Sequence, residues 1–116
     1  MKITNLDKIE KIKMTMEGAK DTWKQVPISA KDGSPNVSLR VFAIMPGGHT
    51  PHHTHPFEHL NYIIEGEGVT VAEDGNERPV KKGDFALVAP GEKHQYKNKS
   101  TQNPLVMICI VPKEYE

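Results

Sequence analysis

The sequence of 116 residues has little that would direct it to a membrane, a nucleic acid or a covalent cross-link. Cys109 is its only cysteine, so no intramolecular disulfide can form and a reducing, cytoplasmic location is expected. No apolar run approaches the roughly eighteen residues that span a membrane, and residues 1–10 lack the apolar core of a signal peptide. The 15 basic and 15 acidic residues cancel, so no net field attracts nucleic acid or anionic lipid.

Several catalytic signatures are missing as well. The sequence has no Gly-x-Ser-x-Gly nucleophile motif, no phosphate-binding glycine loop and no Cys-x-x-Cys pair. These absences argue against serine-hydrolase, nucleotide-binding and dithiol chemistry.

Turn-forming residues punctuate the whole sequence, which contains nine glycines and nine prolines. Their spacing is typical of short strands joined by turns, and the length allows one domain, residues 1–116. Only Asn5–Met14 has helical spacing, and that stretch is brief. Many short strands predict an all-β sandwich or barrel. The expected strands are residues 26–30, 38–45, 60–65, 69–72, 85–89, 95–97 and 105–111.

Histidine is concentrated in one stretch, His53-Thr54-His55-Pro56-Phe57-Glu58-His59, and His94 follows about thirty-five residues later. Side chains two apart on an extended chain point the same way, so His53 and His55 are expected to share one face. A third imidazole beyond the proline bend, and a fourth from a distant segment, can close around the same ion. The pattern therefore predicts a metal site.

Glycines and a proline frame both histidine segments. Five residues separate Gly47 from His53, six separate His59 from Gly66, and the second segment contains Gly83-Asp84, Pro90-Gly91, His94 and Asn98. This arrangement resembles the two-motif signature of the cupin superfamily, with motif 1 over residues 47–66 and motif 2 over residues 83–98. The resemblance implies an all-β, single-domain cupin β-barrel, which is a double-stranded β-helix or jelly roll, with a short N-terminal extension.

One position departs from the common cupin pattern, because His59 stands where a glutamate is usual. The nearest glutamate, Glu58, comes one residue early and is expected to point away. The sequence therefore resembles the small four-histidine cupins, which implies the metal ligands His53, His55, His59 and His94. Four neutral imidazoles leave a divalent ion with both its charges, which makes it a stronger Lewis acid.

The metal is expected to be one divalent transition ion per chain. Imidazole ligands favour Fe, Ni, Cu and Zn, while Mn fits the habit of the family, so the sequence does not identify the ion. Five further residues are candidates for the lining of a pocket around it: Arg40, Phe57, Tyr96, Met107 and Cys109. The last three fit core packing slightly better than pocket lining, and Phe57 also fits as a simple hydrophobic cover.

Arg40 falls in the middle of an expected strand, where a buried charge needs a partner. That partner is either an acidic residue or an anionic substrate, and the sequence leaves both open. His52 is expected at the surface, and His49 at the surface or at the mouth of the pocket.

The resemblance implies a metal-dependent enzyme of oxygenase type that acts on a small organic substrate at the four-histidine ion. A hydrolase, lyase or isomerase on the same site stays open, because one fold supports many chemistries. Two non-catalytic alternatives are a small-ligand binding or sensor module and a structural zinc site. The expected partners are a small molecule and a second copy in a homodimer, without nucleic acid or membrane contact.

Overall fold

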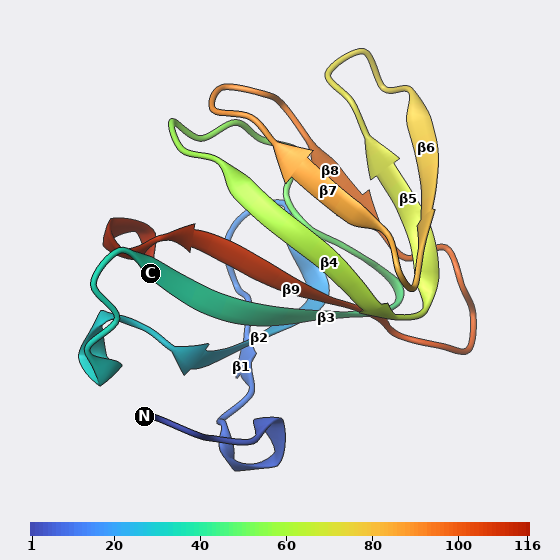
Figure 1. The fold of residues 1–116 in the computed structure, drawn as a ribbon. Helices are drawn as coiled ribbons and strands as arrows, with labels where there is room; N and C mark the ends of the chain where they lie inside the picture. Colours follow the sequence, from blue (N-terminus) through green and yellow to red (C-terminus); the bar gives the residue numbers. More distant parts are fainter.

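A single antiparallel sheet of nine strands curls into half of a barrel in the computed structural model, which describes residues 1–116 (Figure 1). The strands are β1 Ile12–Lys13, β2 Lys20–Ile28, β3 Val37–His49, β4 His59–Glu65, β5 Glu67–Val71, β6 Glu77–Lys81, β7 Phe85–Val88, β8 Gln95–Lys97 and β9 Leu105–Pro112. Three turns of 3-10 helix complete the chain: η1 Leu6–Lys8, η2 Ala30–Asp32 and η3 Lys113–Tyr115. None of them is long or apolar enough to cross a membrane. The all-β barrel class predicted from the sequence is confirmed.

The strand order places segments that are distant in sequence beside one another. The main path runs β6-β5-β8-β3-β9-β4-β7, and β2 and then β1 extend from β3. At the centre, β3 and β9 pair in unbroken register from Val37 opposite Pro112 to Ile44 opposite Leu105. In Figure 1 the long strands β3, β9 and β4 curve along one side, while β5 to β8 rise above them.

The core lies inside this curve and follows from alternation along the strands. Every second residue of β9 is buried, as the two-residue period of a strand requires. On β3, Ser38, Arg40, Phe42 and Ile44 are buried in the same way. The buried hydrophobic cluster consists of Phe42, Ile44, Ile63, Tyr96, Leu105, Met107, Cys109 and Val111.

The helical spacing of Asn5–Met14 does not produce an α-helix. The segment forms only the turn Leu6–Lys8 and the short strand Ile12–Lys13, which pairs with β2. The amide of Gln25 on β2 donates to the carbonyls of Leu6 and Ile9, each at 2.9 Å. A helix shorter than about twelve residues is marginal in water, so these contacts with β2 decide the conformation.

Two other elements differ from expectation. β2 begins at Lys20 instead of residue 26, and Ala30 belongs to the turn η2. β6 was missed because its sequence, Glu-Arg-Pro-Val-Lys, has almost no apolar alternation. It pairs with β5 at one edge of the sheet, where Pro79 sits opposite Val69. An edge strand tolerates proline because one side of its backbone needs no partner.

The outer face of β4 and β7 is apolar, although it faces solvent. Leu60, Phe85 and Leu87 are 48%, 81% and 66% exposed. A shallow groove runs over this face, and Ile108 and Ile110 of β9 line it together with these residues. β7 is also the free edge of the sheet. An antiparallel sheet with one solvated face normally carries polar residues there, so this face has the composition of a contact surface.

The turn between β4 and β5 requires glycine for two reasons. Gly66 has a φ of 81°, in the left-handed region that side chains rarely adopt. A Cβ atom at this position would also lie 2.1 Å from the carbonyl oxygen of Pro104. The turn therefore depends on the absence of a side chain.

We predict that Gly66→Ala destabilises the protein much more than Gly75→Ala does. Gly75 has a similar φ of 86°, but a Cβ atom there meets nothing within 4 Å. Gly75→Ala should cost about 1 kcal/mol from the backbone alone, and Gly66→Ala more than about 3 kcal/mol because the backbone of Pro104 must move. Urea unfolding of both variants measures the difference, and equal losses would contradict the clash.

Candidate metal centre

Backbone pairing brings the two histidine segments together. The N–H of His53 donates to the carbonyl of His94 at 3.1 Å, and the N–H of His94 donates back to His53 at 3.0 Å. Further along, the N–H of Gly91 donates to the carbonyl of His55 at 2.8 Å. His59 begins β4 and pairs with Val88 of β7. Main-chain hydrogen bonds therefore fix the backbone positions of these histidines, independently of contacts between their side chains.

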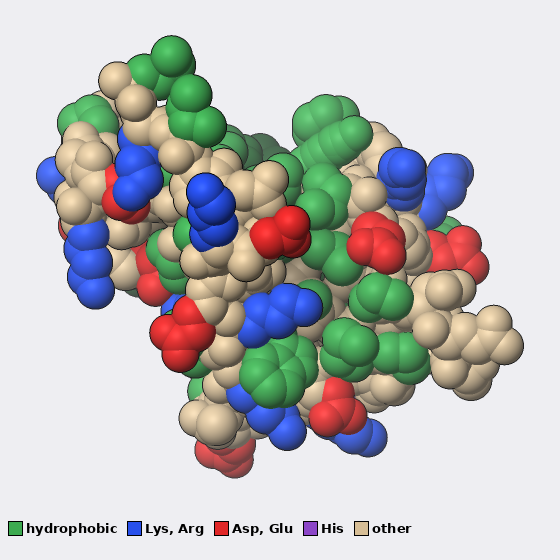
Figure 2. All heavy atoms as spheres, turned by 90° about the horizontal axis from the view of Figure 1, so that it is seen from below, with side chains coloured by type: hydrophobic (Ala, Val, Ile, Leu, Met, Phe, Trp, Pro, Cys, Tyr) green, Lys and Arg blue, Asp and Glu red, His purple; other side chains and the backbone are tan.

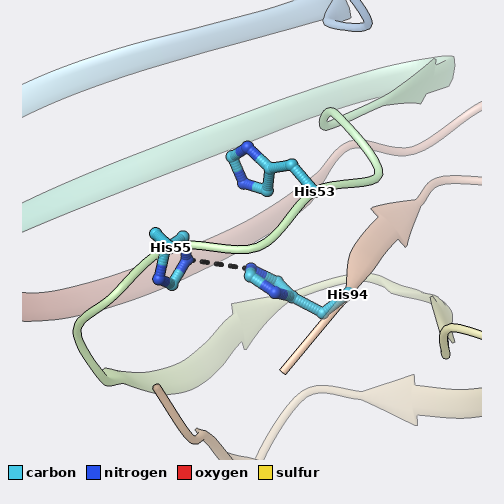
Figure 3. A group of neighbouring side chains, drawn as sticks. All are labelled: His53, His55 and His94. Carbon is cyan, nitrogen blue, oxygen red and sulfur yellow. Dashed lines mark hydrogen bonds between the residues drawn. The ribbon is translucent and has the colours of Figure 1, made fainter. Parts of the chain in front are cut away.

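Three imidazoles form a cluster that fits one ion. A ring nitrogen from each of His53, His55 and His94 lies within 4.8 Å of the others. Figure 3 shows that His53 and His55 come from the loop before β4, and His94 approaches them from the segment leading into β8. No histidine side chain reaches the face of the molecule in Figure 2. The three side chains thus converge from two separate loops.

Hydrogen bonds fix the tautomers of His55 and His94. Nδ1 of His55 lies 2.8 Å from the carbonyl oxygen of Phe57, and Nδ1 of His94 lies 2.9 Å from that of Glu92. A carbonyl oxygen only accepts, so both Nδ1 atoms carry the proton and both Nε2 atoms carry a lone pair. Carbonyl partners of this kind are typical of metal-binding histidines, because they orient the ring.

The two lone pairs face each other. Nε2 of His55 and Nε2 of His94 are 3.3 Å apart, along the dashed line in Figure 3. Two lone pairs at this distance repel unless a proton or a metal ion lies between them. A metal ion that binds imidazole at about 2.1 Å can contact both nitrogens at once. The donor set therefore fits a divalent ion.

The cluster is also electrostatically suited to a metal. Burial lowers the pKa of His53 and of His94 from the usual value of 6.5, and neighbouring imidazoles lower both further. For His94, the carbonyl of Glu92 opposes part of this shift. A lowered pKa keeps an imidazole neutral at physiological pH, and only the neutral form binds a metal.

His59 is close to the cluster but is turned towards Arg40. Its ring stacks on that of His55, with centroids 4.0 Å apart. Its Nε2 lies 3.3 Å from Nη2 of Arg40, and because a guanidinium group only donates, His59 must accept. Burial, with the charges of His55 and Arg40, lowers the pKa of His59 to about 3. The lone pair needed for a fourth metal bond is thus already engaged.

A cavity of about 250 Å³ adjoins the imidazoles. The five residues proposed from the sequence all lie in its wall: Arg40, Phe57, Tyr96, Met107 and Cys109. Tyr96 donates its hydroxyl hydrogen to Oδ1 of Asn61 at 3.0 Å, and burial raises the pKa of this tyrosine. Nη2 of Arg40 lies 3.1 Å from Sγ of Cys109, which is buried and forms no disulfide. The wall is mainly apolar, with a few polar groups at fixed positions.

Seven lining residues were not found from the sequence: Met14, Met16, Phe42, Thr50, Pro51, Asn61 and Tyr115. Asn61 lies two residues after His59 on β4, so the alternation of side chains along a strand could have indicated that it faces the cavity. Met14, Met16 and Tyr115 have no local signal, because they come from segments near the two ends of the chain. His49 and His52 lie outside the cavity wall, and Nε2 of His52 contacts the carbonyl of Ala72 at 3.0 Å. Glu58 is exposed.

Comparison with known proteins gives a family match over most of the chain. Residues 40–111 match the family model described as "Cupin domain". The chain is 28% identical over 112 residues to L-ectoine synthase from Halomonas elongata, which covers 95% of this chain and 79% of that protein. It is 32% identical over 93 residues to gentisate 1,2-dioxygenase 1 from Aquipseudomonas alcaligenes. That match covers 74% of this chain but only 27% of the dioxygenase.

A solved structure has nearly the same fold. The polyketide cyclase RemF from Streptomyces resistomycificus superposes with a TM-score of 0.90 at 26% sequence identity. The superposition covers 97% of this chain and 79% of the cyclase. The whole barrel therefore has a counterpart in a protein whose sequence is only distantly similar.

We predict that His94→Ala weakens zinc binding by more than about a hundredfold, because loss of a ligand costs at least as much as loss of its supporting hydrogen bond. His52→Ala is the matched control, since His52 neighbours the cluster in sequence but contacts Ala72 instead. Titration of zinc into chelator-treated protein against a competing dye measures both affinities. Equal affinity of the two variants would contradict the site, provided that circular dichroism shows both folded.

Proposed function

The chain belongs to the family of cupin domains, and we propose that it is a metal-dependent enzyme acting on a small organic substrate. The proposed ligands of one divalent transition ion are His53, His55 and His94, with His59 as a fourth. One observation carries this proposal: the Nε2 lone pairs of His55 and His94 face each other at 3.3 Å. A metal ion bound by both Nε2 atoms would relieve that repulsion, and both rings are held in place by backbone carbonyls.

A bound ion would supply Lewis acidity, polarising a carbonyl group or lowering the pKa of a water molecule. The protein residues around it provide the binding site for a substrate. Phe57 and Met107 present apolar surface to the cavity, which excludes water and favours an apolar substrate body. His59 can bind the ion through Nε2 only after Arg40 releases it, so Arg40 and the ion compete for the same lone pair.

Tyr96 is proposed as a hydrogen-bond donor to the substrate. Its raised pKa keeps the hydroxyl protonated at neutral pH, so it can donate but does not serve as a base. Asn61 accepts this hydrogen in the present structure and holds the ring in position. A substrate oxygen that replaces Asn61 as acceptor would lie on the wall beside Met107 and Cys109.

Two classes of reaction have support from relatives. L-ectoine synthase and the polyketide cyclase match this chain over 95% and 97% of its length, and their names denote synthesis and ring closure. They favour a redox-neutral reaction driven by Lewis acidity, which we take as the first candidate. The oxygenase reaction expected from the sequence is the second, supported by the gentisate 1,2-dioxygenase match over 27% of that protein.

The geometry gives less support to a purely structural zinc site. A structural zinc ion is normally enclosed by four protein ligands. Here the three imidazoles whose nitrogens converge line a cavity of about 250 Å³, which leaves room for a molecule beside the ion. A binding site with open space is what an enzyme or a ligand-binding protein requires.

We also propose that the protein forms a homodimer through the outer face of β4 and β7. Leu60, Phe85 and Leu87 expose apolar surface that two copies would cover by packing face to face. The formal net charge is zero, so two copies do not repel each other. The free edge of β7 adjoins this face.

We predict that the zinc-loaded protein catalyses a redox-neutral reaction of small diketones in the absence of dioxygen. Zinc has no redox chemistry, and Lewis acidity is sufficient for such a reaction. His94→Ala should lower kcat/KM by more than about a hundredfold, and His52→Ala should leave it unchanged. Product formation is followed by mass spectrometry under anaerobic conditions. Turnover only with iron and with consumption of dioxygen would support the oxygenase candidate, and no turnover with any ion would refute the enzyme proposal.

We predict that the double variant Phe85→Glu and Leu87→Glu is monomeric at micromolar concentration, while the unmodified protein has the mass of a dimer. Burying four added charges at the contact opposes association, whereas the monomer keeps its core because both side chains are exposed. Ile3→Glu, at a position 80% exposed outside this face, is the control and should remain a dimer. Light scattering gives the masses. A monomeric unmodified protein would contradict the proposal.

A further inference from the structure

Arg40 is a buried cation with an unsatisfied donor. Only 8% of the residue is exposed, and it lines the cavity beside His59. One of its terminal nitrogens contacts His59 and Cys109, but its Nε has no partner at all. The hydroxyl of Ser38, two residues earlier on the same face of β3, also has none. Buried polar groups without partners are rare in folded proteins, so the protein's own groups do not satisfy all the polar atoms around Arg40.

One carboxylate already sits at this place, and it belongs to the chain itself. Both side-chain carboxylate oxygens of Glu116, Oε1 and Oε2, lie 3.0 Å from Nζ of Lys24. Oε1 of Glu116 is also 3.5 Å from Nη1 of Arg40. The three charged side chains are largely shielded, with exposed fractions of 25% for Lys24, 10% for Arg40 and 16% for Glu116. Two cations thus converge on a position for one carboxylate.

The segment that carries Glu116, residues 113–116, lines the cavity through Tyr115 and has few attachments to the rest of the fold. Tyr115 lines the cavity and stacks on Phe57 with ring centroids 3.7 Å apart. Phe57 stacks in turn on His55 at 4.3 Å. The turn has no side-chain cap, and its first N–H bonds to the carbonyl of Asn36. Displacing the segment would therefore break one aromatic stack and the ion pairs of Glu116.

We propose that Lys24 and Arg40 form a binding subsite for a carboxylate of the substrate, and that Glu116 occupies this subsite until the substrate displaces it. The inference rests on the proposed function and names its substrate class, a small carboxylic acid with a flat apolar body. The planar fork of a guanidinium group matches a carboxylate, and it is more weakly hydrated than an ammonium group. Displacement of Tyr115 would free the face of the Phe57 ring on which it stacks, and that face would take the flat body of the substrate.

Benzoate is the probe for this subsite, and benzamide is its neutral counterpart. Calorimetric titration is done on the full chain after removal of metal by a chelator. Glu116→Gln should bind benzoate about tenfold more tightly than the unmodified protein, because the tethered competitor has been removed. Neither protein should bind benzamide measurably. Glu77→Gln is the matched control, since Glu77 pairs with Lys99 at the surface away from the cavity, and it should bind benzoate like the unmodified protein.

Two further variants identify the cations. In the Glu116→Gln background, Arg40→Gln should weaken benzoate binding by about tenfold and Lys24→Gln by about threefold, because Lys24 is the more exposed of the two. Circular dichroism verifies folding. Should Arg40→Gln fail to fold, the Lys24 variant decides the question alone, and unchanged affinity in it overturns the subsite.

The outcomes separate this inference from the metal-dependent function. If Glu116→Gln does not bind benzoate, the subsite is overturned. The metal proposal still stands in that case if the protein binds zinc and His94→Ala abolishes zinc binding. Binding of inorganic phosphate as tightly as benzoate overturns the assignment to carboxylic acids. If metal-free protein binds benzoate and Arg40→Gln removes this binding, the subsite is supported whether or not a reaction is detected.

Discussion

Two hydrogen bonds between the backbones of His53 and His94 are the constraint on which the site depends. They join a loop before β4 to the segment before β8, which are distant in sequence. The amide of Gly91 extends the pairing to His55, and the N–H of Thr50 extends it to Tyr96. Main-chain pairing of this kind is rigid, so it fixes the separation of the Cα atoms from which the imidazoles extend. Such preorganisation is what a site needs to bind an ion without first reordering its ligands.

The part of the site that the sequence predicted is the part determined by strand periodicity and turn chemistry. Alternation along β9 places Met107 and Cys109 on the inner face. The spacing predicted that His53, His55, His59 and His94 would meet, and the ring nitrogens of His53, His55 and His94 do so. The glycine turns were equally readable, because a positive φ leaves few residue types. Asn98 closes the second motif by donating to the carbonyls of Ile44 and Asn103, which ties β8 to its neighbours. These features depend on local geometry, which a single sequence records.

The remaining features depend on contacts between distant segments, which no local pattern records. β6 is held by pairing with β5 rather than by apolar alternation, and the segment 5–14 follows β2 rather than its own helical spacing. The side chain of His59 turns to Arg40 because a buried guanidinium group has a strong demand for an acceptor. Tyr115 reaches the cavity only because β9 ends beside it. The sequence position and residue type of His59 and Tyr115 do not determine which way their side chains point.

The features that oppose stability lie in one region of the fold. The facing nitrogens of His55 and His94 repel, and Arg40 and Ser38 leave buried polar atoms without partners. Apolar residues of similar size would remove these penalties if packing were the only requirement. A metal ion would satisfy the imidazoles, but it offers nothing to the unpaired guanidinium nitrogen, because both are positively charged. The two kinds of unmet demand therefore call for ligands of opposite charge, a cation at the histidines and an anion at Arg40. Departures from local consistency are expected where a chain is adapted to bind something other than itself.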